Sequence, residues 1–326
     1  MTKMPFHLLV AVLAPLYVGT AMGAQRVQNY PTKPIRLILP FAPGGGADLT
    51  GRMVAPGLTE RLGQPLVIDN RPASAGIVGA EIAARAAPDG YTLLIATSSF
   101  AANPSIYKKL PYDVLKDFAP ITLAVNSPLV MVVHPSVPAK SVQELIAFAR
   151  ANPKKLNYGS SGSGGAPHIA GEMLKSMARI EIEHISYKGI GQVLTALLGN
   201  EVQMTFSNLF VAQPHITSGR MRALAITSPE RSKAKPEWPT MAESGLPGYQ
   251  TGLWFGFMAP SGTPDPIVRR LNKELVSILS QPELVNNIRA QGGDVVAGTP
   301  EEFARLLRDD IVRYGKIIRA AGIAQQ

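Results

Sequence analysis

Two stretches of the chain share one pattern: LILPFAPGGGAD at residues 37–48 and LNYGSSGSGGAPH at residues 156–168. In each, a short strand-like run leads into a glycine-rich loop, and residues with a helical pattern follow. Ligands of open α/β sheets bind at the carboxyl ends of strands, where such loops lie. The pattern therefore predicts that each half of the protein contributes one loop to a ligand site, unless the glycines only connect strands to helices.

Strands and helices alternate along the rest of the chain, which predicts an α/β fold of mostly parallel open sheets flanked by helices. A length of 326 residues also favours two domains. We expect strands at 35–40, 66–70, 91–96, 121–125, 129–133, 156–158, 179–187, 202–206, 221–226, 253–258 and 294–296. We expect helices at 48–62, 77–86, 141–151, 167–178, 193–198, 265–280, 283–290 and 300–321, and one that ends at Gly219.

The first 24 residues have the three parts of a secretory signal peptide. Lys3 gives a positive start, residues 8–18 are uninterruptedly apolar, and small residues dominate 19–24. The apolar run is shorter than the ~20 residues that a membrane-spanning helix needs. We therefore expect a periplasmic protein, cleaved after Gly23 or Ala24, and this location argues against a nucleic acid partner.

The composition excludes several kinds of site. The chain has no Cys, so it forms no disulfide and no thiolate metal site, and it has no Cys nucleophile. Its five His residues lack the spacing of a zinc motif. We therefore expect neither a metal nor a cofactor. The 32 Lys and Arg residues exceed the 23 Asp and Glu residues, and the resulting charge of +9 attracts anions in general.

The chemistry of the two loops indicates an anion site built from main chain. The first turn of a helix leaves N–H groups unpaired, and the helix dipole places partial positive charge there. No side chain is charged in residues 41–47 or 159–167, and neither loop has the Walker or the dinucleotide pattern. A carboxylate therefore fits better than a phosphate. We expect Asp48 to cap its helix, with Arg52 either paired to it or turned toward the ligand.

Signs of catalysis are few. Ser160, Ser161 and Ser163 do not form a Gly-x-Ser-x-Gly nucleophile elbow. His168 follows them at the start of the next helix, where a structural role is the simpler interpretation. An exported serine hydrolase that uses Ser161 or Ser163 with His168 stays an alternative to a non-enzymatic binding protein.

A series of short motifs makes the chain resemble the tripartite tricarboxylate transporter substrate-binding family, also called Bug proteins, from about Tyr30 to Ile323. The motifs that carry the resemblance are YPTKPIR at 30–36, PFxxGGxxDxxxR at 40–52, NRP at 70–72, GxxG at 76–79, PDGYTL at 88–93, LPYD at 110–113, YGSSG at 158–162, YKG at 187–189, PHI at 214–216, RALA at 222–225 and APxGTP at 259–264.

The resemblance implies a two-domain Venus-flytrap receptor of the periplasm, monomeric, which closes on a small organic acid and delivers it to a membrane permease. Crossings near residues 126–128 and 247–249 would divide the mature chain into domain 1, residues 25–126 with 250–326, and domain 2, residues 127–249. A carboxylate sensor that serves signalling rather than transport is a further alternative.

The resemblance also implies that a ligand carboxylate lies between the first loop, residues 41–48, and the second loop, residues 160–165 with His168. On this basis the predicted ligand-binding residues are Phe41, Gly44, Gly45, Gly46, Ala47, Asp48, Thr97, Ser98, Ser160, Ser161, Gly162, Ser163, Gly164, Gly165, His168, Tyr187, Gly189 and Asn208. Gly165 stands where the family commonly has Ser or Thr. Ile190 and Gln192 also depart from the family, and they either narrow or polarise the distal end of the pocket or pack on a helix.

Overall fold

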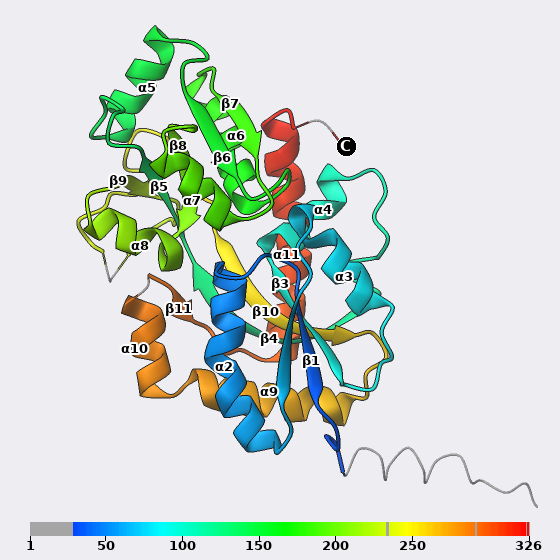
Figure 1. The fold of residues 1–326 in the computed structure, drawn as a ribbon. Helices are drawn as coiled ribbons and strands as arrows, with labels where there is room; N and C mark the ends of the chain where they lie inside the picture. The colour runs from blue at the N-terminus through cyan, green and yellow to red at the C-terminus, as the bar shows by residue number, and fades with distance from the viewer. Residues whose placement is uncertain (1–28, 233–234, 291, 324, 326) are drawn as a thin grey trace, which may run out of the picture.

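Two β-sheets flanked by helices make up the computed structural model of the protein (Figure 1). The structure describes residues 29–232, 235–290, 292–323 and 325, so the predicted signal peptide lies outside the described residues. The predicted α/β class is confirmed. No helix in the described ranges is both long and apolar enough to cross a membrane.

The first sheet, sheet A, is built from both ends of the described chain. Its strand order is β11 (Asp294–Val295), β4 (Phe118–Ser127), β10 (Leu253–Pro260), β3 (Thr92–Thr97), β1 (Ile35–Leu39) and β2 (Leu66–Asn70). One face packs against α2 (Gly46–Leu62) and α9 (Asp265–Leu279), with α10 (Pro282–Ala290) beside them. The other face packs against α3 (Ile77–Ala84), α4 (Ser98–Ile106) and α11 (Pro300–Ala320), and η1 (Ser74–Gly76) lies against α3 and α4.

The second sheet, sheet B, is built from the middle of the chain. Its strand order is β7 (Glu183–Ser186), β6 (Asn157–Ser160), β8 (Met204–Asn208), β5 (Leu129–Val133) and β9 (Arg222–Ile226). The helices α5 (Val142–Ala151) and α6 (Ala166–Ala178) contribute to the apolar cluster on one face. On the other face lie α7 (Ile190–Leu198) and α8 (Leu209–Thr217).

The sheets are mixed rather than mostly parallel as predicted. Strands β1, β2 and β3 pair in parallel, and so do β6, β7 and β8. At the edge of sheet A, the short strand β11 pairs antiparallel with β4. The other antiparallel pairs involve β10 and β5, the strands that follow the crossings between the sheets. Strand β10 returns from sheet B and lies antiparallel to β3 and β4, while β5 arrives from sheet A and lies antiparallel to β8 and β9. A strand that enters from the other sheet starts at the edge where its neighbours end, so it runs against them.

The largest differences from the sequence-based expectation are at α4 and β7. Helix α4 was not predicted, because Ser98, Asn103 and Pro104 are poor helix formers and packing decides its structure. Phe100 and Ile106 are buried in the core, and α4 lies against α11. The strand predicted at 179–187 shrinks to β7, because Arg179 ends α6 in a left-handed conformation with φ of 51°.

One apolar cluster joins the two sheets. It contains Ile38 and Leu94 of sheet A, Met131 and Phe206 of sheet B, and the buried face of α11. Helix α11 runs along sheet A and ends beside α6 (Figure 1). A polar contact reinforces the junction, since the hydroxyl of Ser176 on α6 donates to the carbonyl of Ala320 at the end of α11 at 3.3 Å.

Candidate ligand-binding site

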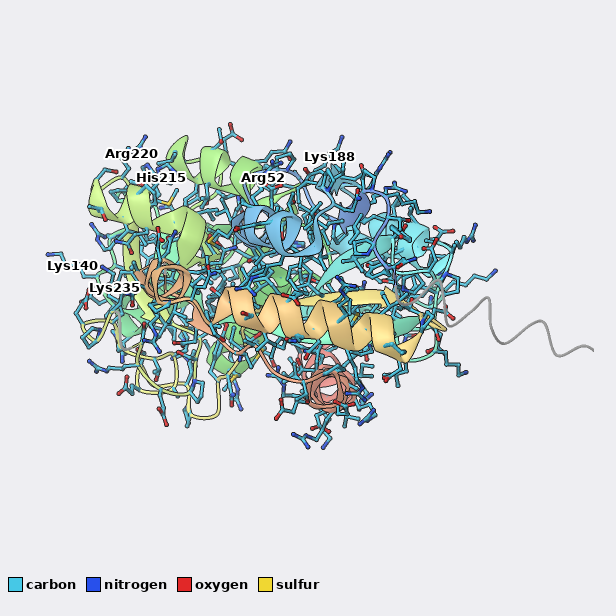
Figure 2. All side chains as sticks on the ribbon, turned by 90° about the horizontal axis from the view of Figure 1, so that it is seen from below. Arg52, Lys140, Lys188, His215, Arg220 and Lys235 are labelled. Atoms are coloured by element: carbon cyan, nitrogen blue, oxygen red, sulfur yellow. The ribbon has the colours of Figure 1, made fainter. Side chains whose placement is uncertain are left out.

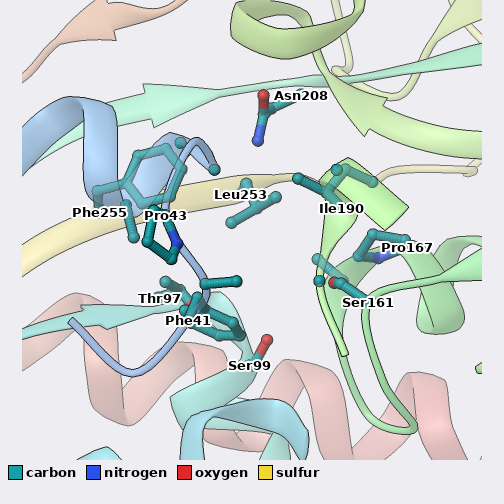
Figure 3. A pocket seen from close by; sticks show the side chains of 17 residues that line it. Phe41, Pro43, Thr97, Ser99, Ser161, Pro167, Ile190, Asn208, Leu253 and Phe255 are labelled. Carbon is teal, nitrogen blue, oxygen red and sulfur yellow. The ribbon is translucent and has the colours of Figure 1, made fainter. Parts of the chain in front are cut away.

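A pocket lies between the two sheets (Figure 3), at the carboxyl ends of β1 and β3 on one side and of β6, β7 and β8 on the other. Its empty volume is about 580 Å³, including open solvent at the mouth. The lining residues are Phe41, Ala42, Pro43, Gly45, Gly46, Ala47, Thr97, Ser99, Ser161, Ala166, Pro167, Gly189, Ile190, Gly191, Asn208, Leu253 and Phe255.

Four helices begin at the pocket without a side chain that caps their first turn. These are α2, α4, α6 and α7, whose N-cap residues are Gly45, Thr97, Gly165 and Gly189. Their dipoles bring partial positive charge to one small volume. No charged side chain lines the pocket, so the wall offers a ligand only backbone groups and uncharged side chains. The arrangement favours a small anion.

The positive side chains lie outside the pocket. Arg52, Lys188 and Arg220 are exposed, and Figure 2 places them on the outer surface. The net charge of the chain is therefore a property of the surface, and the pocket itself relies on backbone groups. Within the described part of the chain, no group of three His, Asp or Glu side chains is placed to hold a metal ion.

Asp48 does not line the pocket, but its hydrogen bonds hold the first loop in place. The residue does not cap α2 as predicted, because Gly45 is the N-cap and Asp48 is the third residue of the helix. Its Oδ2 accepts the N–H of Gly44 at 3.0 Å and Nε of Arg52 at 2.9 Å, and its Oδ1 accepts Nδ2 of Asn70 at 3.1 Å. The pairing of Arg52 with Asp48 is thus local, one of the two predicted possibilities.

These bonds decide the charge of Asp48. Burial alone would raise the pKa of this carboxyl, but the hydrogen bonds from Arg52, Gly44 and Asn70 outweigh it and lower the pKa below the ordinary value. Asn70 also donates to the Phe41 carbonyl at 3.1 Å. The first loop is therefore tied to the end of β2 through one ionised carboxylate and one amide.

A histidine holds the second loop in the same way. The N–H of Gly164 donates to Nδ1 of His168 at 3.0 Å. The His168 ring lies 4.2 Å from the ring of His184, and Nε2 of His184 lies 2.6 Å from the hydroxyl of Ser160. Burial lowers the pKa of both histidines, that of His184 to about 4, so both are neutral at pH 7. As neutral side chains, they hold the second loop in place through Gly164 and Ser160.

The hydrolase alternative is not favoured by this geometry. The serine that contacts a histidine is Ser160, which is fully buried and does not line the pocket. Ser161 does line the pocket, but Nδ1 of His168 is occupied by the Gly164 amide. A nucleophile and its base would have to meet at a point that a substrate can reach.

The structure brings eight of the predicted site residues to the pocket wall: Phe41, Gly45, Gly46, Ala47, Thr97, Ser161, Gly189 and Asn208. The other predicted residues lie behind or beside the wall: Gly44, Asp48, Ser98, Ser160, Gly162, Ser163, Gly164, Gly165, His168 and Tyr187. Gly44, Asp48, Ser160, Gly164 and His168 make the bonds inside the loops described above. That any of them contacts a ligand stays a prediction.

The pocket wall also contains residues that were not predicted. Ala42, Pro43, Ser99, Ala166, Pro167 and Gly191 are neighbours of predicted residues, so their loops were the available signal. Leu253 and Phe255 come from β10, and nothing in an apolar strand marks which residues face a ligand. Ile190 was predicted either to shape the pocket or to pack on a helix. It lines the pocket and also packs on the α7 core. Gln192 accepts the Lys188 N–H at 3.1 Å and does not line the pocket.

The two sheets meet closely around the pocket. A Cβ atom added to Gly46 would lie 2.9 Å from Nδ2 of Asn208, and one added to Gly189 would lie 3.3 Å from Cβ of Ala42. On another side of the pocket, the hydroxyl of Tyr107 donates to the Ser163 carbonyl at 2.9 Å. Groups from both sheets therefore surround whatever occupies the pocket.

Comparison with known proteins gives consistent matches over nearly the whole chain. The family model for the tripartite tricarboxylate transporter family receptor matches residues 50–323. BugT of Bordetella pertussis is 36% identical over 96% of this chain and 97% of its own. The solved structure of Rpa4515 from R. palustris with adipate is 36% identical and covers 91% of this chain and all of its own, with a TM-score of 0.89. MatC from Rhodopseudomonas palustris with bound malate is 29% identical and covers 89% of this chain and all of its own, with a TM-score of 0.85.

Proposed function

The chain belongs to the tripartite tricarboxylate transporter receptor family, and from this premise we propose that it captures a small organic carboxylate between its first and second loops. One observation carries the proposal. Four helices begin, uncapped by side chains, at a pocket that no charged side chain lines. A carboxylate there accepts hydrogen bonds from backbone N–H groups and lies at the positive ends of the helix dipoles.

Related proteins support the same class of ligand. The structures of Rpa4515 and MatC are described with adipate and malate, which are both small carboxylates. Relatives described as receptors and periplasmic binding proteins are also consistent with a protein that binds without turnover. The family implies a periplasmic location, which agrees with the signal peptide proposed for residues 1–24.

We also propose that the two domains close on the ligand and that membrane permease subunits receive it. We assign residues 25–126 with 250–326 to one domain and 127–249 to the other, so that β4 leads out of the first domain and β10 leads back. Binding in the pocket would then favour the closed arrangement of the two domains, because the ligand contacts both. The receptor acts as a monomer and delivers its ligand to permease subunits in the membrane.

A thermal-shift screen of the mature chain tests the proposal. The screen uses small mono- and dicarboxylates, each paired with its neutral amide. A ligand at 100 times its dissociation constant adds ~2.7 kcal/mol to the free energy of unfolding, which such a screen detects readily. We expect at least one carboxylate to stabilise the protein and its amide to have no effect.

A screen without a carboxylate-specific response would contradict the proposal. If a folded, ligand-free sample responds to no carboxylate, or responds equally to the amides, the proposal is wrong. Ester hydrolysis would then be measured with the wild type and with Ser161→Ala. Turnover that disappears in the variant would revive the hydrolase alternative.

A further inference from the structure

We propose that the pocket takes carboxylates without an amino group, and that the side-chain amide of Asn208 helps to set this preference. The inference rests on the proposed function and adds the class of carboxylate. It concerns the acceptors that the pocket offers, since an ammonium group needs acceptors as much as a carboxylate needs donors.

Asn208 presents a hydrogen-bond donor to the pocket. It is the N-cap of α8, and its Oδ1 accepts the N–H of Val211 at 3.3 Å. Only the amide oxygen can accept a bond from a backbone N–H, so this contact fixes which way the amide is turned. Nδ2 then faces the pocket (Figure 3), next to Gly46 at the start of α2. The residue is 5% exposed, so its neighbours hold the amide in this orientation.

No acidic side chain lines the pocket to balance this donor. The other polar side chains of the lining are the hydroxyls of Thr97, Ser99 and Ser161, which carry no charge. Asp48 stands behind the first loop with its side chain 4% exposed, and both of its oxygens are occupied. The nearby carboxylate is thus unavailable to a ligand.

The backbone carbonyls at the starts of the helices are also engaged. The oxygens of Gly45, Gly165 and Gly189 accept the N–H groups of Leu49, Ile169 and Val193 inside their own helices. What these N-caps offer to the pocket is therefore the donor side of the backbone. An ammonium group would meet the positive ends of four helices and no anionic partner, which is costly for a buried charge. A 2-amino acid should bind more weakly than the same acid without its amino group.

Matched pairs of acids test the inference. Calorimetric titration is carried out with succinate and L-aspartate, propionate and L-alanine, adipate and L-2-aminoadipate, and the best acid of the carboxylate screen with its 2-amino analogue. We expect the amino member of each binding pair to have at least about tenfold lower affinity, which corresponds to ~1.4 kcal/mol. Equal or tighter binding of the amino members overturns the inference while the carboxylate proposal stands. If no acid binds, both fall together.

Two substitutions at Asn208 test its part in the preference. Asn208→Asp keeps an oxygen that caps α8 but replaces the donor in the pocket with a carboxylate. Asn208→Ser also keeps a capping oxygen, and it replaces the amide donor with a shorter hydroxyl without adding charge. We expect N208D to weaken the preferred acid by about tenfold or more and to narrow or reverse its advantage over the amino analogue. N208S should weaken the acid less and leave the order of the pair unchanged.

The ratio of the two affinities separates this role from a purely structural one. A variant that only damaged α8 would lower both affinities together, and it would also lower the unfolding midpoint of the ligand-free protein. We expect that midpoint to stay close to wild type for N208D and N208S, because both retain the cap. If N208D preserves both the affinity for the acid and the ratio, Asn208 does not set the preference.

Discussion

The backbone N–H of Gly164 donates a 3.0 Å hydrogen bond to Nδ1 of His168, four residues further along the chain. The first loop repeats this relationship, since the N–H of Gly44 donates at 3.0 Å to Oδ2 of Asp48. Both glycines have φ near +80°, and both stand directly before the N-cap of the following helix. Each loop therefore contains the same kind of turn. A carboxylate accepts the closing hydrogen bond in the first loop, and an imidazole accepts it in the second.

The turn in the second loop should fail when its acceptor is removed. In His168→Leu the buried N–H of Gly164 loses its partner, and an unsatisfied buried donor costs ~1–3 kcal/mol. We expect unfolding in urea to show a loss of this size, together with weaker carboxylate binding. His168→Asn retains an uncharged acceptor and should recover part of both. A leucine variant as stable and as tight-binding as the wild type would contradict the supporting role of His168.

The two buried histidines make stability depend on pH. Burial lowers the pKa of His168 and of His184, and the second falls to about 4, whereas a histidine in the unfolded chain titrates near 6.5. As the pH drops below 6.5, the unfolded state takes up protons that the folded state does not bind, so the free energy of unfolding decreases until the pH reaches the folded pKa. Above pH 7 these residues contribute no further change.

Urea unfolding at pH 7.5, 6.0, 5.0 and 4.5 measures this dependence. His184→Gln keeps a polar partner for Ser160 but cannot titrate, so its stability should fall less steeply over the same range. His184 is not responsible if the wild type and H184Q lose stability in parallel between pH 6.0 and 4.5.

Removing Asp48 should cost much more stability than removing Arg52, its partner in the ion pair behind the first loop. Asp48→Ala removes the acceptor of Gly44, Arg52 and Asn70 at once, and we expect a loss of about 2–3 kcal/mol because the carboxylate is buried and its bonds are charge-assisted. Arg52→Ala removes one partner whose side chain is 53% exposed, and exposed pairs contribute below about 1 kcal/mol. Equal losses in the two variants, measured by urea unfolding, would mean that the ion pair and not the loop is what Asp48 supports.

The sequence was informative where local pattern and packing agree. The strand at 35–39 is a short apolar run, and the helix at 300–320 has an amphipathic pattern that begins at a capping box of Thr299 and Glu302. Helix α4 was missed because its structure depends on burial against α11. The direction of β10 was missed because it depends on the path between the sheets, which no local pattern records.

The sequence indicated which loops form the site, but not which of their residues line the pocket. Glycines before a helix start are visible in sequence, so Gly45, Gly46 and Gly189 were found, and the structure places them on the pocket wall. Sequence could not separate residues that line the wall from those that hold a loop from behind, such as Asp48 and His168. It also gave no sign of Phe255, whose position depends on which face of β10 meets the first loop.

Two neighbouring glycines provide a matched test of how closely the sheets meet. A Cβ atom at Gly46 would lie 2.5 Å from Cζ of Phe255 and 2.9 Å from Nδ2 of Asn208, so Gly46→Ala must displace one of them. The same methyl group at Gly45 would meet only Ala42 and Ile190, each at 3.7 Å, which is ordinary contact. We expect G46A to lower the affinity for the preferred carboxylate by about tenfold or more, and G45A to lower it less.

Both variants add one methyl group beside the same helix start, so calorimetric titration compares them directly. Alanine is a better helix former than glycine, so G46A gains helix propensity at the first position of α2, whereas G45A loses a favourable N-cap. Helix stability alone would therefore make G45A the more damaging change. A larger loss of affinity in G45A than in G46A would show that helix stability governs binding, and that the close approach of Gly46, Phe255 and Asn208 does not.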